Sequence, residues 1–197
     1  MNPTIDSISP EHGRVPVSER TKLVPEMTFP AYTHVPSLTP HPTRDPRGHR
    51  YGQPEWQATE LTFSNWRDNP LFLYGFDLLN HGYFWEAHDA WEACWHAVGR
   101  KGPCAELLKS LIKLAACGVA LRKNEISLAK RHLRRAFFLM VQRSVRTSDL
   151  HLLGIHRWEV FLMFNVLNIN DLAFSLAGSE NVVFPFIILP EGVVVAD

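Results

Sequence analysis

His88 and Glu92 are the two side chains of this sequence whose types and spacing are best suited to chemistry. They lie in a run, residues 80–99, that reads as a tight turn followed by a helix. Because positions i and i+4 share one face of a helix, the imidazole and the carboxylate are expected to lie side by side. Trp95 continues that face and Trp91 flanks it. A titratable pair among tryptophans indicates a buried polar centre or a site for a divalent ion.

A divalent ion would need ligands from outside this helix, because protein sites usually supply three or four. The Pro-rich segment that precedes the helices carries several histidines, and His41 and His49 are the two predicted to complete the shell. A zinc, manganese or iron ion held by His88, Glu92, His41 and His49 would support a hydrolytic reaction. The predicted outer shell or polar centre consists of Glu86, Lys113, His132 and Asp45.

Two other interpretations of the same residues need no metal. A buried carboxylate costs several kcal/mol unless it has a partner, and Lys113 or Arg131 could neutralise Glu92 in a buried polar network. Alternatively, the domain is a non-catalytic interaction module. Trp91 and Trp95 would then line an aromatic groove on the first helical hairpin, which holds a partner segment or the chain's own arm. The pattern leaves open whether the protein is an enzyme.

Four helices are predicted to position these residues, over residues 70–80, 83–98, 102–123 and from about 125 onward. Asn69 and Pro70 form a typical helix start. Only three residues, 80–82, separate the first two helices, which predicts an antiparallel hairpin. The third helix is apolar almost all round, so we expect it to be central and the most buried. The predicted fold class is all-α, a bundle of about four core helices in two antiparallel hairpins.

The remaining segments predict an arm and short C-terminal additions. Residues 1–28 are expected to be a disordered tail. Residues 29–69 combine many prolines with apolar side chains, which indicates an extended arm packed on the body. The helical domain is expected to span residues 70–178, with helix-like stretches at 151–168 and 168–178. Residues 179–197 are expected to form an extended tail, with a strand-like stretch at 182–189.

Composition narrows the classes of partner and compartment. The chain has 20 basic and 20 acidic residues, so its bulk charge points to no polyanionic partner. Three cysteines without a C-x-x-C pair predict neither a disulfide framework nor a zinc–thiolate site, and they fit a reducing cytoplasm. No signal sequence or membrane-spanning run is recognisable.

Charge is distributed unevenly along the chain. Residues 100–146 hold twelve Lys or Arg against two acids, whereas the preceding helix, with Glu86, Asp89 and Glu92, is acidic. A basic cluster such as Arg131, Arg134 and Arg135 is usually a solvated face, so nucleic-acid binding is not favoured. A homo-oligomer stays open.

The run Leu78-Leu-Asn-His-Gly-Tyr-Phe-Trp-Glu-Ala-His-Asp-Ala-Trp-Glu-Ala-Cys-Trp95 resembles the bacterial and archaeal family called domain of unknown function 309. Its hallmark is N-x-G-x-(Y/F)-x-E-A-H-x-x-x-E-x-x-W, followed by an L-I-x-L-A-A helix and an arginine-rich helix, here at 110–116 and 130–136. The resemblance covers about residues 70–142, and the Pro-His-Pro arm is similar to that of a longer subgroup. It implies an all-helical fold and a suggested metal site involving Glu86, His88, Glu92 and Trp95. Asp89 and Trp91 depart from the residues that other members often carry.

Overall fold

The computed structural model describes residues 20–146, 151–156, 184 and 187–190. Four helices form the body within this part of the chain: α1 (Pro70–Asn80), α2 (Phe84–Ala97), α3 (Gly102–Arg122) and α4 (Ile126–Arg146). A short 3-10 helix, η2 (Trp66–Asp68), precedes α1. Two two-residue strands, β1 (His151–Leu152) and β2 (Ile155–His156), pair antiparallel after α4. The predicted all-α bundle with an extended N-terminal arm is confirmed.

The α1–α2 hairpin begins and turns where the sequence predicts. The Asn69 side chain accepts a hydrogen bond from the Phe72 N–H at 3.0 Å, which caps the start of α1 beside Pro70. The helix ends at Asn80, and Gly82 takes a positive φ of 84°. Only a residue without a Cβ adopts that conformation readily, and it allows α2 to begin two residues later.

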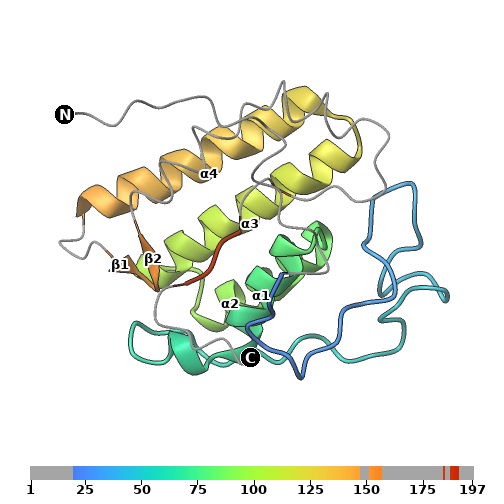
Figure 1. Ribbon diagram of the computed structural model, residues 1–197, viewed down its shortest axis with the longest axis horizontal. Coiled ribbons are helices and arrows are strands. Elements are labelled where there is room, and N and C mark those ends of the chain that lie inside the picture. Colours follow the sequence, from blue (N-terminus) through green and yellow to red (C-terminus); the bar gives the residue numbers. More distant parts are fainter. Residues whose placement is uncertain (1–19, 147–150, 157–183, 185–186, 191–197) are drawn as a thin grey trace.

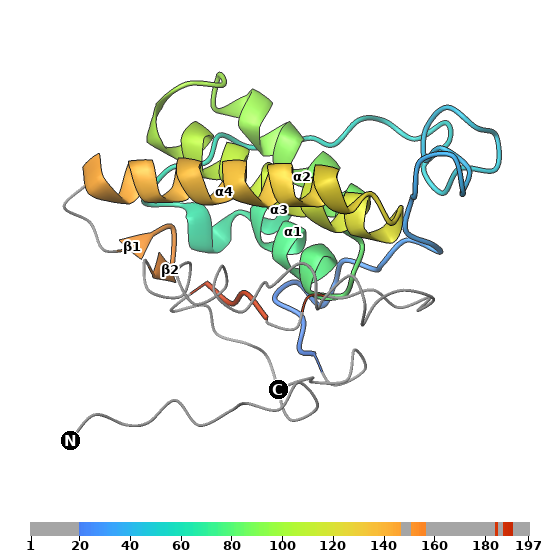
Figure 2. The same cartoon turned by 90° about the horizontal axis from the view of Figure 1, so that it is seen from above.

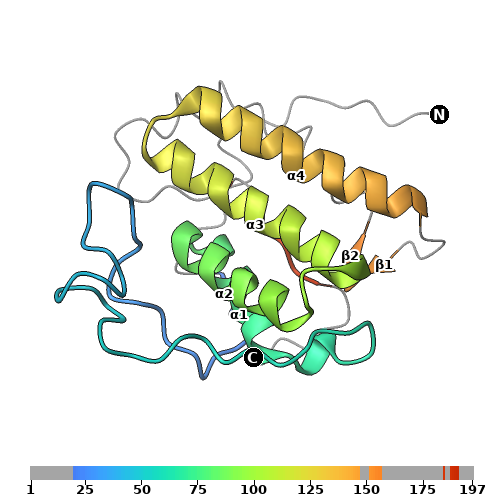
Figure 3. The same cartoon turned by 180° about the vertical axis from the view of Figure 1, so that it is seen from behind.

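Helix α3 lies between α2 and α4, as Figures 1 and 3 show from opposite sides. The Ser110 hydroxyl donates to the Ala136 carbonyl oxygen at 2.8 Å and links α3 to α4. On the other side, Gly118 lies so close to the Phe84 ring that any Cβ there would collide with it. The central position predicted for this helix is confirmed.

The prediction that α3 is the most buried helix is wrong. Ten of the eleven residues of α1 are buried, compared with twelve of the twenty-one residues of α3. The reason is that α1 is covered on its outer side by segments from both ends of the described chain. Leu23 and Val24 from the N-terminal side and Ile188 from the C-terminal side are buried in the same core as α1. Figure 2 shows the residue 187–190 segment beside α1.

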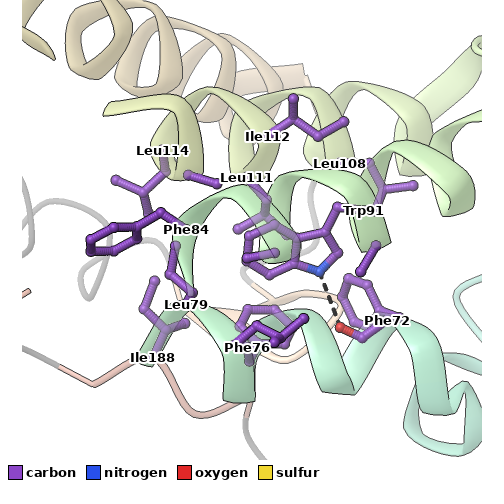
Figure 4. Close-up of a cluster of buried hydrophobic side chains, with 14 of the residues drawn as sticks. Phe72, Phe76, Leu79, Phe84, Trp91, Leu108, Leu111, Ile112, Leu114 and Ile188 are labelled. Atoms are coloured by element: carbon purple, nitrogen blue, oxygen red, sulfur yellow. Dashed lines mark hydrogen bonds between the residues drawn. The ribbon is translucent and has the colours of Figure 1, made fainter. Parts of the chain in front are cut away.

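Trp91 is a core residue and lines no open groove. Its side chain is fully buried, and its indole N–H donates to the Phe72 carbonyl oxygen at 3.0 Å (Figure 4). The Phe76 ring meets the indole edge-to-face at a centroid distance of 5.1 Å. A Cβ at Gly75 would collide with the same indole, so α1 and α2 approach closely at this point. The predicted role of Trp91 in an aromatic groove is therefore corrected.

Two predicted segments differ from their predictions within the described residues. Residues 20–28 were expected in a disordered tail but pack on α1, whereas residues 1–19 lie outside the described part. Residues 151–156 were expected to be helical but form the β1–β2 hairpin. Leu153 and Gly154 both have positive φ, 50° and 81°, which is the backbone of a tight two-residue hairpin turn. The helix predicted at 168–178 lies outside the described residues, and residues 184 and 187–189 of the predicted strand have no regular structure.

Asn80 joins the end of α1 to the C-terminal segment. Its side-chain amide donates to the Ile188 carbonyl oxygen at 2.9 Å, and its carbonyl oxygen accepts from the Ile188 N–H at 3.0 Å. Both bonds are buried, so Asn80→Ala leaves a backbone donor and acceptor unpaired. We expect the free energy of unfolding to fall by about 1–3 kcal/mol, measured in a denaturant melt, together with faster hydrogen exchange at Ile188.

Asn65→Ala is the matched control, since the Asn65 side chain bonds only to nearby loop residues. Equal losses in the two variants would contradict a tether between α1 and the C-terminal segment.

None of the described helices combines the length and apolarity needed to cross a bilayer.

Candidate functional site

The buried polar centre of the protein is built on Glu86, in the first turn of α2. One carboxylate oxygen accepts from the His34 backbone N–H at 2.7 Å and contacts the His49 Nε2 at 3.0 Å. The other accepts from the Thr33 hydroxyl at 2.9 Å. The Glu86 and His49 side chains are each only 4% exposed. Three groups of the arm thus converge on one carboxylate of the helical body.

Aromatic rings surround this centre. The Tyr32 ring packs edge-on against His49 at a centroid distance of 4.7 Å, and the Trp85 ring packs edge-on against His34 at 4.7 Å. His41 lies beside His34, with ring centroids 5.2 Å apart. Burial is the main reason that the pKa of His34 is lowered from its ordinary value, and the neighbouring His41 lowers it further. The arm histidines therefore cluster at the N-terminal end of α2.

A second carboxylate of α2, Asp89, holds the part of the arm that follows. Its Oδ2 atom accepts from the Arg50 guanidinium at 3.0 Å and from the Trp56 indole N–H at 2.9 Å. The guanidinium also lies over the Trp56 ring, 3.9 Å from its centroid. Burial raises the pKa of Asp89, and Arg50 and Trp56 oppose that rise.

A third carboxylate, Asp77 of α1, holds the start of the described chain. Its two oxygens accept from the Leu23 and Val24 backbone N–H groups at 2.7 and 2.9 Å. Burial raises its pKa, and these two hydrogen bonds lower it. We refer to Asp77, Glu86 and Asp89 together as the arm-binding face. Each of the three carboxylates bonds to a different stretch of the N-terminal segment.

His88 and Glu92 do not form the buried centre that the sequence predicts. Their side chains are 31% and 46% exposed, and His88 Nδ1 lies 3.9 Å from Glu92 Oε2, which is beyond hydrogen-bonding distance. The reason is rotation around α2. Glu86 and Asp89 face the arm, whereas His88 lies farther round the helix near Lys113 and His132, and Glu92 is nearly half exposed. The charged residue of the motif that is buried is Glu86.

Lys113 and His132 lie near His88. Burial lowers the pKa of His132, and Lys113, Arg131 and His88 lower it further, in that order. Burial also lowers the pKa of His88; Glu92 opposes this change and Lys113 adds to it. We refer to His88, Lys113, Arg131 and His132 as the basic junction of α2, α3 and α4.

The four predicted metal ligands have different contact partners in the structure. His49 contacts Glu86, and His88 faces Glu92. The His41 Nδ1 accepts backbone N–H groups of its own turn at 3.3 and 3.4 Å. Within the described residues, no three His, Cys, Asp or Glu side chains are placed to hold a metal ion.

Asp45 and Trp95 also lie outside the polar centre. Asp45 pairs with Arg47 at 2.9 Å on the surface of the arm, and this partner lowers the pKa of Asp45 to about 2. Trp95 is half-buried at the edge of the core, with the Arg100 guanidinium 5.4 Å from its ring centroid. Neither residue contacts Glu86.

Residues 72–132 match the model of the family described as Domain of unknown function (DUF309). The chain resembles DUF309. The match begins within α1 and ends in the first half of α4, so it contains Asp77, Glu86 and Asp89 together with the basic junction. The arm lies outside the matched residues, and the subgroup with a Pro-His-Pro arm stays a prediction. No curated protein and no solved structure matches the chain.

Sequence reasoning missed Asp77 and Asn80 and assigned Asp89 no role. A signal for the first two was present, because each is a polar residue inside an otherwise apolar helix. Buried polar groups need partners, so such residues predict hydrogen bonds to another segment. No periodic signal identifies the arm residues that supply those partners, because the arm has no repeating structure.

The lowered pKa values of His34, His88 and His132 predict a pH dependence of stability. Above the unfolded value of about 6.5, all three are neutral in both states and their contribution is complete. As the pH falls through that value, the unfolded chain binds protons first, so the free energy of unfolding decreases. Denaturant melts at pH 7.5 and 5.0 should show this loss.

His132→Gln should make the loss of stability between pH 7.5 and 5.0 smaller, because one of the groups with a lowered pKa is removed. His96→Gln, at an exposed position, is the control and should leave the loss of stability between the two pH values unchanged. A wild-type protein that is equally stable at both pH values would contradict the prediction.

Proposed function

We propose that the domain is an interaction module whose α1–α2 hairpin binds an extended polypeptide segment, and that its own arm occupies this surface. The observation that carries the proposal is the coordination of Glu86 by Thr33, His34 and His49. A carboxylate that accepts both a backbone N–H and side-chain donors can recognise an extended chain and also select its residues. The first hairpin thus has the role considered for it from the sequence, through carboxylates in place of a tryptophan groove.

The other two carboxylates extend the same recognition along the segment. Asp77 binds two consecutive backbone N–H groups. This contact restricts the residue types of the bound segment only weakly, because it uses the backbone alone. Asp89 binds an arginine and a tryptophan side chain, which requires a particular sequence. Prolines reduce the conformational freedom of the free arm, so less entropy is lost when it binds. An external partner would carry donors at matching intervals and displace the arm.

A competition experiment on the full-length protein tests the proposal. The probe is a fluorescent peptide with the sequence of residues 20–58, titrated into wild type and into Arg50→Ala, which loses the hydrogen bond between its own arm and Asp89. We expect the variant to bind the peptide about tenfold more tightly, because a charge-assisted hydrogen bond of the competing arm is gone. Arg47→Ala is the control, since Arg47 bonds only within the arm.

The peptide should fail to bind when the double variant Arg50→Ala, Glu86→Gln is used, because the central carboxylate is lost. Equal binding by wild type and Arg50→Ala would contradict the proposal that arm and peptide compete for one surface. Binding that is insensitive to Glu86→Gln would place the peptide elsewhere on the protein.

A divalent metal site with hydrolytic activity is the second proposal. The observation that favours it is the meeting of one predicted arm ligand, His49, with Glu86 of the motif. A third ligand, such as His41, would have to leave its present contacts. Elemental analysis of protein purified without chelator or affinity tag tests this proposal. Less than about a tenth of an equivalent of zinc, manganese or iron, with no rise in melting temperature on adding these metals, would contradict it.

A further inference from the structure

The basic junction lies where α2 meets α3 and α4, and it has no part in the proposed function. Two contacts set the register of its three helices. Gly118 of α3 lies against Phe84 of α2, and Ser110 of α3 bonds to Ala136 of α4. Both pairs of neighbours are antiparallel. One helical turn along from each contact, Lys113 comes to lie between His88 and His132.

The side chains of the junction repel one another electrostatically. Lys113 disfavours the protonated forms of both His88 and His132, and Arg131 acts in the same way on His132. No hydrogen bond or ion pair between described residues uses the Lys113 ammonium or the Arg131 guanidinium. Among the described residues, the Lys113 and Arg131 donors near the two imidazoles therefore have no bonded acceptor.

Two acids lie near the junction, and each is only partly available to it. Asp89 is already bonded to Arg50 and Trp56 of the arm. Glu92 is the remaining acid near His88; it favours the protonated imidazole, but its contact is loose at 3.9 Å and its side chain is 46% exposed. Across residues 100–146, two acids oppose twelve basic residues, and one of the two, Glu125, is paired with Lys123 at 2.5 Å.

We propose that the basic junction formed by His88, Lys113, Arg131 and His132 is a binding site for a phosphoryl dianion. A tetrahedral phosphoryl group presents several acceptor oxygens, which match convergent ammonium, guanidinium and imidazole donors. Lys113, His88 and His132 are half-buried where three helices meet. This half-buried junction of three helices suits a single phosphoryl group better than an extended nucleic-acid strand.

Inorganic phosphate is the probe for the test, titrated into the full-length protein at constant ionic strength with chloride as the balancing anion. The readout is the ring proton signals of the ten histidines in NMR spectra. We expect saturable shifts confined to His88 and His132, with the melting temperature rising over the same range of concentration. Shifts no larger than those in chloride alone, or shifts spread over all the histidines, would overturn the proposal.

For three substitutions, the proposal predicts whether phosphate binding becomes weaker, stays the same or becomes stronger. Lys113→Met should weaken phosphate binding by about tenfold or more, because a charge-assisted hydrogen bond is lost. Lys109→Met, on the same helix but exposed, should leave the affinity within about twofold. Glu92→Gln removes the opposing charge and should strengthen binding. Lys113→Met could also lose binding because it is less stable, which a lower melting temperature would reveal. Glu92→Gln still tests the proposal in that case, because its expected result is a gain of affinity.

A short single-stranded oligonucleotide distinguishes a phosphoryl group from a polyanion. At the same phosphate concentration, the oligonucleotide should bind no more tightly than inorganic phosphate. Tight binding that survives Lys113→Met but is lost in Arg134→Gln would place the anion on the exposed face of α4 and overturn the assignment of the junction.

Discussion

Glu86→Ala is expected to lower the free energy of unfolding by about 3–5 kcal/mol and to release the arm from α2. The substitution removes the common acceptor of Thr33, His34 and His49 and leaves their donors without it in a buried site. Loss of one partner from such a network costs the full desolvation of those that remain. A denaturant melt measures the stability. Limited proteolysis within residues 29–51 measures the release of the arm.

Glu92→Ala is the matched control for this experiment. Glu92 lies on the same helix and in the same sequence motif, but its side chain is 46% exposed and has only the loose contact with His88. Substitutions at such surface positions usually change stability by less than about 0.5 kcal/mol. Equal losses for the two glutamates, or an arm that stays resistant to proteolysis in Glu86→Ala, would contradict the structure described for the polar centre.

Trp91→Ala is the second substitution with a large expected effect, a loss of about 3–5 kcal/mol. The indole is fully buried between α1 and α3, and its N–H bonds to the Phe72 carbonyl oxygen. The close approach of α1 and α2 at Gly75 leaves little freedom for the helices to collapse into the space. We expect a residual cavity and an unpaired carbonyl, both of which lower the midpoint of a denaturant melt.

Trp95→Ala provides the comparison within the same motif. Trp95 is only half-buried, so its loss should cost clearly less than that of Trp91. Gly75→Ala tests the same contact from the other side, because the added methyl group would press on the indole and cost about 1–3 kcal/mol. A Trp91→Ala variant as stable as Trp95→Ala would contradict the core position of Trp91.

The pairing of charges differs from the prediction in a way that matters for function. The acidic α2 and the basic α3–α4 hairpin suggested ion pairs between them. The arm takes Glu86 and Asp89 instead, through Thr33, His34, His49, Arg50 and Trp56. The basic residues beside α2 are therefore left without those acids. This is the physical origin of the anion site proposed at the basic junction.

The helical architecture follows from the sequence alone. Asn69, Pro70 and Gly82 set the limits of the first hairpin through cap and turn chemistry that acts over a few residues. Apolar periodicity identified α3 as the central helix, because a helix without a polar face must be covered on several sides. The resemblance to domain of unknown function 309 could also be recognised from the sequence, because its motif is contiguous within α1 and α2.

Tertiary structure alone decided which member of the motif is buried. A helical wheel places His88 and Glu92 on one face, but it does not say which face meets another segment. That choice depends on the arm, which lacks periodicity and whose path is determined by hydrogen bonds to residues 33–53 positions away in the chain. The cover on α1 likewise comes from Ile188, 108 positions beyond Asn80. Local sequence patterns can indicate that a buried polar residue needs a partner. They do not identify a partner at such a separation, because the donors and acceptors are brought together only when the chain folds.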